Sequence, residues 1–99
     1  MKSETLQLPA SLSANRIREI ARRNGARQVR LFGSRARGEA RSDSDLDLLV
    51  ELEPGRDLFD LIEIKLELEA ESPVPVQVLT EGFLSPYFRD RVIDEAVEL

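Results

Sequence analysis

Three aspartates alternate with other residues near the middle of the chain, at Asp43, Asp45 and Asp47. In a strand, the side chains of residues i and i+2 point to the same face, so at least two of these carboxylates are expected to converge. Neighbouring carboxylates raise each other's pKa unless a cation compensates their charge. Mg²⁺ prefers such hard oxygen ligands and is commonly held by one or two carboxylates together with substrate phosphates. The pattern therefore predicts a magnesium site formed by at least two of these aspartates.

A second group suited to chemistry lies just upstream, at Gly33 and Ser34. Glycine lets the backbone approach an anion closely, and Ser34 adds a hydroxyl where a short helix can begin. The guanidinium groups of Arg35 or Arg37 are suited to forked contacts with phosphate oxygens. Together with the aspartates, this turn predicts a site for a nucleoside triphosphate and Mg²⁺. We include Asp43 among the expected nucleotide-binding residues. Two metal ions can support phosphoryl-type transfer without any histidine or cysteine.

Each piece also has a simpler interpretation. A Gly-Ser pair alone is typical of an ordinary turn, and residues 42–45 also fit a solvated loop before a strand. Asp47 interrupts an apolar run, so it lies either on a solvated sheet face or in a functional site. The arginines between positions 16 and 30 favour a solvated helix face over a binding surface.

Composition limits the remaining choices. The 99 residues contain no cysteine and no histidine, which excludes a thiolate nucleophile, a histidine base and a typical zinc site. A net charge of -5 argues against a broad nucleic-acid-binding surface. Neither a signal peptide nor a membrane-spanning run is apparent, so we expect a cytoplasmic protein without membrane contact.

Helices and strands are expected to alternate around these motifs. Helices are predicted at 13–24, 57–70 and 85–96, with a short turn of helix at 35–37. Strands are predicted at 29–32, 46–52 and 74–79. In the second long helix, Leu58, Leu61, Ile62 and Leu66 are expected to share the buried face. The expected fold is α/β (α+β), a small mixed sheet of three or four strands flanked by helices, over 12–99, after a frayed or loosely docked N-terminal arm of residues 1–11.

Residues 33–38, Gly-Ser-Arg-Ala-Arg-Gly, followed by residues 42–50, Ser-Asp-Ser-Asp-Leu-Asp-Leu-Leu-Val, closely resemble the signature of the minimal nucleotidyltransferase family of the DNA polymerase β superfamily. The resemblance continues more weakly to the C-terminus. It implies transfer of a nucleoside monophosphate from an NTP, AMP from ATP, to an acceptor hydroxyl. Gly33 and Ser34 would bind the triphosphate, while Asp45 and Asp47 would hold Mg²⁺, as two ions, and act as the catalytic residues.

Small members of this family are typically encoded beside a HEPN-domain RNase toxin and act as its antitoxin, some of them by adding AMP to a tyrosine of the toxin. No appended acceptor-binding domain is evident here, so the resemblance implies a HEPN-domain partner that supplies the acceptor in trans. Exposed Leu or Phe side chains of the helices at 57–70 and 85–96 would suit a homo- or hetero-oligomer surface, although core packing explains them equally well.

One position departs from the family pattern. The superfamily carries a third carboxylate on the neighbouring strand, and the best-fitting position here is Gln77. Its amide offers a neutral carbonyl to a metal but neither a charge nor a base. Asp57, Glu51 and Glu81 are candidate substitutes that spacing alone does not distinguish. The alternative function is therefore a catalytically impaired domain that binds nucleotide or toxin.

Overall fold

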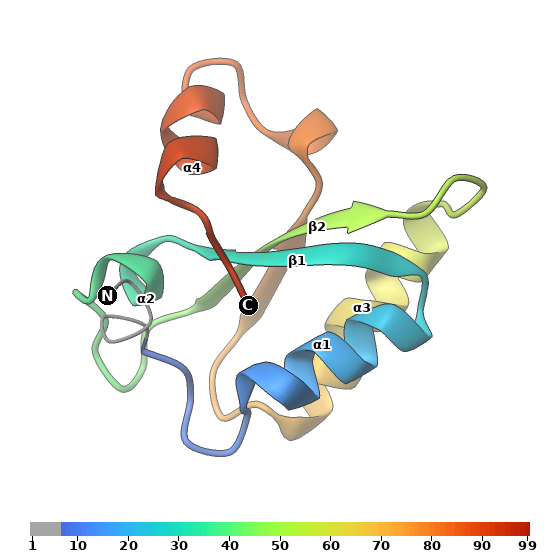
Figure 1. Ribbon diagram of the computed structural model, residues 1–99. Coiled ribbons are helices and arrows are strands. Elements are labelled where there is room, and N and C mark those ends of the chain that lie inside the picture. The colour runs from blue at the N-terminus through green and yellow to red at the C-terminus, as the bar shows by residue number, and fades with distance from the viewer. Residues whose placement is uncertain (1–6) are drawn as a thin grey trace.

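The computed structural model describes residues 7–99, which form one four-stranded mixed sheet with helices on both faces (Figure 1). Its strands are β1 (Ala26–Phe32), β2 (Leu46–Leu52), β3 (Val76–Leu79) and β4 (Val97–Glu98). Their order is β3-β2-β1-β4, with β2 and β3 parallel and the other pairs antiparallel. The predicted mixed α/β fold is confirmed.

Two long helices cover one face of the sheet. They are α1 (Ala14–Arg23) and α3 (Leu58–Glu71), and they lie side by side below the sheet in Figure 1. Ser13 and Asp57 cap them as the sequence predicts, because each side chain accepts a hydrogen bond from a backbone N–H of the first turn. Ion pairs from Arg16 to Glu71 and from Arg23 to Glu67 join the two helices.

The main core lies between these helices and the sheet. From β2 it takes Leu46, Leu48 and Val50, each at most 1% exposed. Alternation then directs Asp47, Leu49 and Glu51 to the opposite face, where a smaller apolar cluster forms around Phe32, Leu49 and Val92. The central strand β2 thus has one face in the main core and an opposite face that carries Asp47, Leu49 and Glu51.

The helix α3 buries a different face from the one predicted. Its buried residues are Leu61, Ile64 and Leu68, whereas Leu58, Ile62 and Leu66 are exposed. Because apolar residues occur on both sides of this helix, its periodicity does not identify the buried side. In the observed rotation, Leu61, Ile64 and Leu68 pack in the main core, and Glu67 and Glu71 face α1, where they form ion pairs with Arg23 and Arg16.

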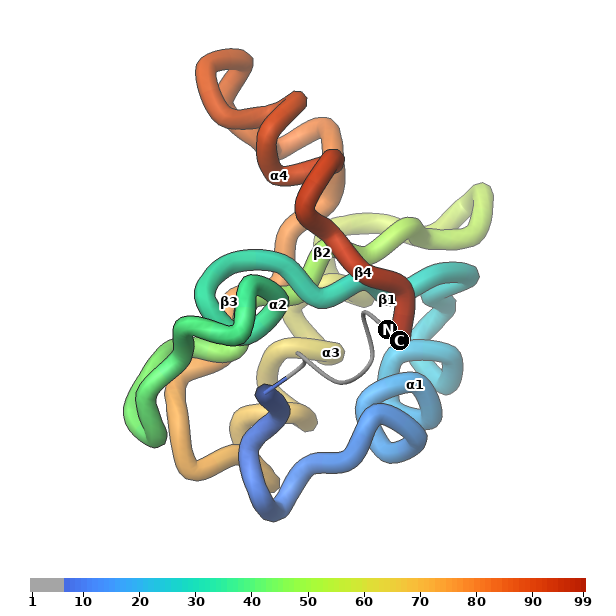
Figure 2. Tube along the Cα trace, turned by 60° about the vertical axis from the view of Figure 1, so that its left-hand side comes forward, coloured from blue at the N-terminus to red at the C-terminus, as the bar shows by residue number. Residues whose placement is uncertain are grey.

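The C-terminal segment also differs from the prediction. The last helix is α4 (Arg89–Glu95) and begins four residues later than expected, after the short 3-10 helix η2 (Glu81–Phe83) and a turn at residues 85–88. Tyr87 is 92% exposed, so no core contact holds that part of the chain in a helix. Beyond α4 the chain returns as β4, an unpredicted two-residue strand beside β1, and α4 projects from the other face of the sheet (Figure 2).

The described part of the predicted arm, residues 7–11, is bound to the domain. The backbone N–H of Gln7 donates to the carbonyl of Arg35, and the Gln7 side chain accepts a hydrogen bond from the backbone N–H of Ala40. Pro9 is buried, and Leu8 packs against the main core. The rest of the arm lies outside the described residues. Within residues 7–99, no helix is long and apolar enough to cross a bilayer.

The two sides of α3 give a matched test of this packing. Leu68→Ala, at a position with 0% exposure, should lower the free energy of unfolding by about 2–5 kcal/mol because it leaves a cavity. Leu66→Ala, at a position with 56% exposure, should change it by less than ~1 kcal/mol. Chemical denaturation of both variants measures the difference, and equal losses would contradict the observed orientation of α3.

Candidate nucleotide and metal site

The two predicted metal ligands lie where the chain enters β2. Asp45 is exposed just before the strand, and Asp47 is half-buried at its second position. Leu46 and Leu48 point into the main core and hold this end of the strand in place. The alternation along the strand therefore places the two carboxylates on the sheet face opposite the main core, at a strand end that core packing holds in place.

Gly33 brings the predicted phosphate turn directly against this acid. Phe32 pairs with Asp47 across β1 and β2, so the residue after Phe32 lies beside the aspartate side chain. Gly33 has a φ of 77°, which favours glycine, and a Cβ at this position would overlap Oδ2 of Asp47. The positive φ thus favours glycine here, any larger residue would displace the carboxylate of Asp47, and the turn and the carboxylate lie side by side.

The electrostatic environment of Asp47 marks it as an unusual carboxyl group. Burial, together with the negative charges of Asp45 and Glu95, raises the pKa of Asp47 to about 6, although Arg37 and Arg35 oppose the increase. Ionised Asp47 is therefore incompletely compensated by the described residues. A divalent cation between Asp45 and Asp47 would supply the missing positive charge.

Arg35 has a different environment from the one predicted for a phosphate ligand. Its side chain is buried, at 4% exposure. Its Nη1 donates to the carbonyl of Gln7 at 2.6 Å, and its Nε and Nη2 donate to the carbonyl of Ser44 at 3.1 and 2.8 Å. Nη2 also reaches the carbonyls of Arg41 and Ser42. The guanidinium group thus donates its hydrogen bonds to main-chain carbonyls and fixes the loop that leads to Asp45.

The other predicted nucleotide-binding residues surround the same turn. Ser34 is the first residue of α2 (Ser34–Arg37), and its hydroxyl forms no hydrogen bond with any residue of 7–99. Arg37, the last residue of α2, is exposed and forms ion pairs with Glu39 and Glu95. Asp43 is exposed in the turn that precedes the pair of acids. Ser34 and Arg37 are therefore available at the site.

Gln77 occupies the position predicted for the third carboxylate of the family. It lies on β3 directly opposite Asp47 in the parallel register, and it is exposed on the same face of the sheet. The position is thus adjacent to the acids, but it carries a neutral amide. No group of three or more His, Cys, Asp or Glu within residues 7–99 is arranged to hold a metal ion.

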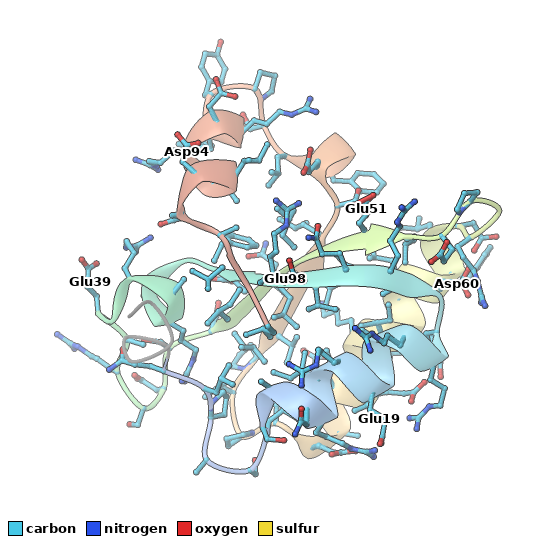
Figure 3. The ribbon with its side chains drawn as sticks, viewed as in Figure 1. Glu19, Glu39, Glu51, Asp60, Asp94 and Glu98 are labelled. Carbon is cyan, nitrogen blue, oxygen red and sulfur yellow. The ribbon has the colours of Figure 1, made fainter. Side chains whose placement is uncertain are left out.

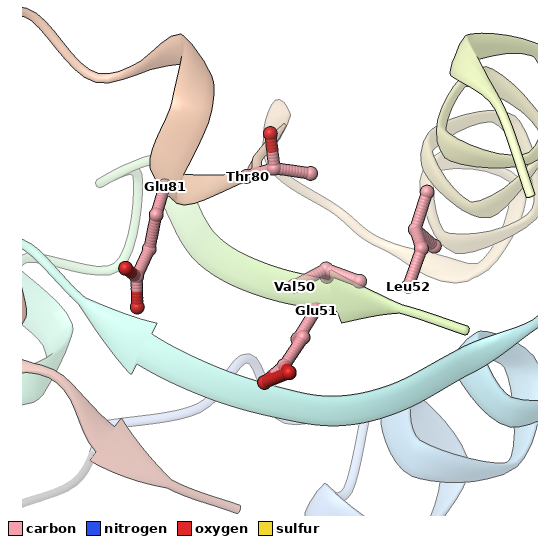
Figure 4. A pocket seen from close by; sticks show the side chains of 5 residues that line it. All are labelled: Val50, Glu51, Leu52, Thr80 and Glu81. Carbon is pink, nitrogen blue, oxygen red and sulfur yellow. The ribbon is translucent and has the colours of Figure 1, made fainter. Parts of the chain in front are cut away.

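The three acids considered as substitutes lie elsewhere. Asp57 caps α3, while Glu51 and Glu81 line a pocket of about 300 Å³ together with Val50, Leu52 and Thr80. This pocket lies at the other end of β2 from Asp47, and the two glutamate side chains point toward β1 (Figure 4). Arg27 and Arg30 form ion pairs with these glutamates.

Glu95 is the additional acid whose negative charge acts on Asp47. It lies at the end of α4, and the position of that helix brings it near the site, so no sequence motif indicates it.

The raised pKa of Asp47 gives a test of this environment. Because the folded-state pKa of Asp47 lies above the ordinary aspartate value of 3.8, the ionised side chain lowers stability above about pH 6, and this cost disappears below about pH 4. Asp47→Asn should therefore raise the free energy of unfolding at pH 7.5 by about 1–2 kcal/mol, after allowance for solvent screening.

Urea denaturation at several pH values measures this difference. Asp43→Asn, in the exposed turn, is the matched control and should change stability by less than ~0.5 kcal/mol. A gain for Asp47→Asn that persists unchanged at pH 3.5 would contradict the assigned cause.

Comparison with known proteins agrees with the site. Residues 14–99 match the family model described as nucleotidyltransferase domain. The chain is 40% identical over 80 residues to a candidate protein adenylyltransferase of Methanocaldococcus jannaschii, covering 81% of this chain and 86% of that protein. It is 34% identical over 93 residues to the protein adenylyltransferase MntA of Thermococcus cleftensis, covering 94% of each.

Solved structures show the same fold. A candidate minimal nucleotidyltransferase superposes with a TM-score of 0.76 and 48% identity, covering 87% of this chain and 88% of the other. A toxin–antitoxin structure with AMP-PNP superposes with a TM-score of 0.73 at 22% identity, covering 88% and 72%, and shows the shared fold. The chain therefore belongs to the nucleotidyltransferase domain family, within its minimal nucleotidyltransferase group.

Proposed function

We propose that this chain is a Mg²⁺-dependent adenylyltransferase that transfers AMP from ATP to a hydroxyl group of a partner protein, a HEPN RNase toxin, and thereby acts as its antitoxin. The observation that carries the proposal is the contact between Gly33 and Asp47, which joins a turn suited to phosphate and a pair of carboxylates in one site. Relatives named as protein adenylyltransferases support a protein acceptor. The toxin–antitoxin structure with AMP-PNP supports both the toxin partner and the nucleotide.

In this reaction the acceptor oxygen forms a bond to the α-phosphorus of ATP, and the bond from that phosphorus to the bridging oxygen of the β-phosphate breaks. Pyrophosphate leaves, and the hydroxyl loses its proton. The open turn at Gly33 and Ser34 would bind the triphosphate, and Arg37 would add a positive charge. Catalysis of this kind depends on positioning and charge neutralisation, which these residues can supply.

The donor set of the site fits magnesium. Asp45 and Asp47 provide hard carboxylate oxygens, and a cation beside them would favour the ionised form of Asp47, whose pKa is raised by burial and by the charge of Asp45. When bound, two Mg²⁺ ions would neutralise phosphate charge and lower the pKa of the attacking hydroxyl. Gln77 would contribute at most a neutral carbonyl oxygen, so the two aspartates would hold the ions together with phosphate oxygens and water.

A second candidate function follows from Gln77. Because this neutral amide lies beside Asp47 where the family has an acid, the domain would be a binding module that neutralises its partner by contact and retains nucleotide binding. The two functions differ in whether neutralisation needs Asp45 and Asp47.

Co-expression with the product of the neighbouring gene separates the two functions. With the wild-type chain, the intact mass of the partner should rise by whole AMP units. With the Asp45→Ala/Asp47→Ala double variant, we expect an unmodified and still toxic partner, because the metal ligands are lost.

Glu98→Ala is the matched control and should leave the partner modified to at least about half the wild-type extent, since this carboxylate contacts Gln28 and both metal ligands are kept. An unmodified partner that co-purifies with the wild type and the double variant, and is neutralised by both, would overturn the enzymatic proposal and support the binding module.

A further inference from the structure

Arg37 is held by two carboxylates that differ in origin and burial. Its Nε donates to Glu39 at 3.0 Å, and its Nη1 donates to Glu95 at 2.8 Å. Glu39 follows α2 in the same loop and is 66% exposed, as its outward position beside α2 shows (Figure 3). The Glu95 side chain comes from the end of α4 and is only 19% exposed. Glu95 is therefore the more firmly placed partner.

The backbone fixes Glu95 at this location. Val97 of β4 pairs with Leu31, and Ala96 packs in the cluster that contains Phe32. Phe32 pairs on its other side with Asp47. Glu95 and Asp47 thus approach the end of β1, where the Gly33–Ser34 turn begins, from opposite sides.

Among residues 7–99, the hydrogen-bond partners of the Arg37 guanidinium occupy two of its three nitrogens. Within residues 7–99, Nε and Nη1 are the donors of both its hydrogen bonds, and Nη2 makes none. An arginine side chain that is 44% exposed would otherwise sample many rotamers. Two carboxylates on two nitrogens restrict the group before any ligand binds, and such restriction lowers the entropic cost of binding.

We propose that Glu95 is a positioning residue, which holds Arg37 beside the Gly33–Ser34 turn so that the free edge of the guanidinium group binds the triphosphate. The inference rests on the proposed nucleotidyltransferase site and adds a role for the α4–β4 junction. Glu95 acts through Arg37 and does not itself touch the nucleotide. Arg37, and not the buried Arg35, is then the arginine that binds phosphate.

Glu95 also carries a negative charge near an anionic ligand, so a single substitution mixes two opposite effects. Its removal would disorder Arg37, but it would also relieve repulsion of the phosphates. A double-mutant cycle separates these effects. If Glu95 positions Arg37, the contribution of Arg37 to binding falls when Glu95 is absent. If Glu95 only competes with phosphate for Arg37, that contribution rises.

The experiment measures the Kd of a non-hydrolysable ATP analogue with Mg²⁺ by calorimetry, for the wild type, Arg37→Ala, Glu95→Ala and the double variant. Arg37→Ala should weaken binding about 10-fold in the wild-type background and less than about 3-fold in the Glu95→Ala background. Glu95→Gln keeps an acceptor oxygen for Nη1 and should preserve most of the effect of Arg37.

Glu98→Ala is the matched control, because this carboxylate accepts a hydrogen bond from Gln28 and does not contact Arg37. In that background the penalty of Arg37→Ala should equal the wild-type value. Circular dichroism and thermal unfolding check that every variant is folded at the temperature of the binding measurement.

An Arg37→Ala penalty that is as large or larger without Glu95 would overturn the positioning role. Failure of the proposed function gives a different result. In that case the wild type would show no Mg²⁺-dependent binding of the analogue, or binding unaffected by Asp45→Asn/Asp47→Asn.

Discussion

The close approach of Gly33 to the carboxylate of Asp47 is the constraint on which the candidate site depends. It requires a positive φ and the absence of a side chain at the residue that follows β1. It also requires that Phe32 pair with Asp47, because a shift of one residue in the β1–β2 register would turn Asp47 toward the main core. The apolar side chains of Leu46, Leu48 and Val50 fix that register, so the packing of the opposite face determines the geometry of the site.

This arrangement places opposing charges around one half-buried acid. Asp45 and Glu95 disfavour the ionised form of Asp47, while Arg37 and Arg35 favour it, and burial makes the balance unfavourable. The two arginines act from different places. Arg35 lies inside and organises the loop that carries Asp45 through main-chain carbonyls, whereas Arg37 lies outside between two carboxylates. In the proposed function, a cation bound between Asp45 and Asp47 would offset this unfavourable charge balance and would hold the phosphates.

Much of the fold could be predicted because its signals are local. Ser13 and Asp57 are helix caps whose function depends on the first turn alone, and the alternation along β2 directly separates the core face from the acids. The pairing of Asp47 with Gln77 could be predicted from the family resemblance, and the register confirms that the two residues are neighbours.

The remaining features depend on contacts between distant segments. The helix α3 is apolar on two sides, and its packing against α1 and the sheet, which the sequence of the helix alone does not specify, buries Leu61 and leaves Leu66 exposed. Arg35 resembles Arg37 in sequence, yet the loop at residues 41–44 and Gln7 enclose it. Glu95 reaches the site because β4 returns beside β1, and a two-residue strand gives almost no periodic signal.

The structure offers two acidic locations on the same sheet face, the Asp45–Asp47 pair and the pocket that contains Glu51 and Glu81. The most direct test is a crystal structure of the chain with Mn²⁺ and a non-hydrolysable ATP analogue, in which anomalous scattering locates the metal. We expect the metal peak between Asp45 and Asp47, with the phosphates against the Gly33–Ser34 turn. A peak between Glu51 and Glu81, with no metal or phosphate near Asp47, would contradict the assignment of the site.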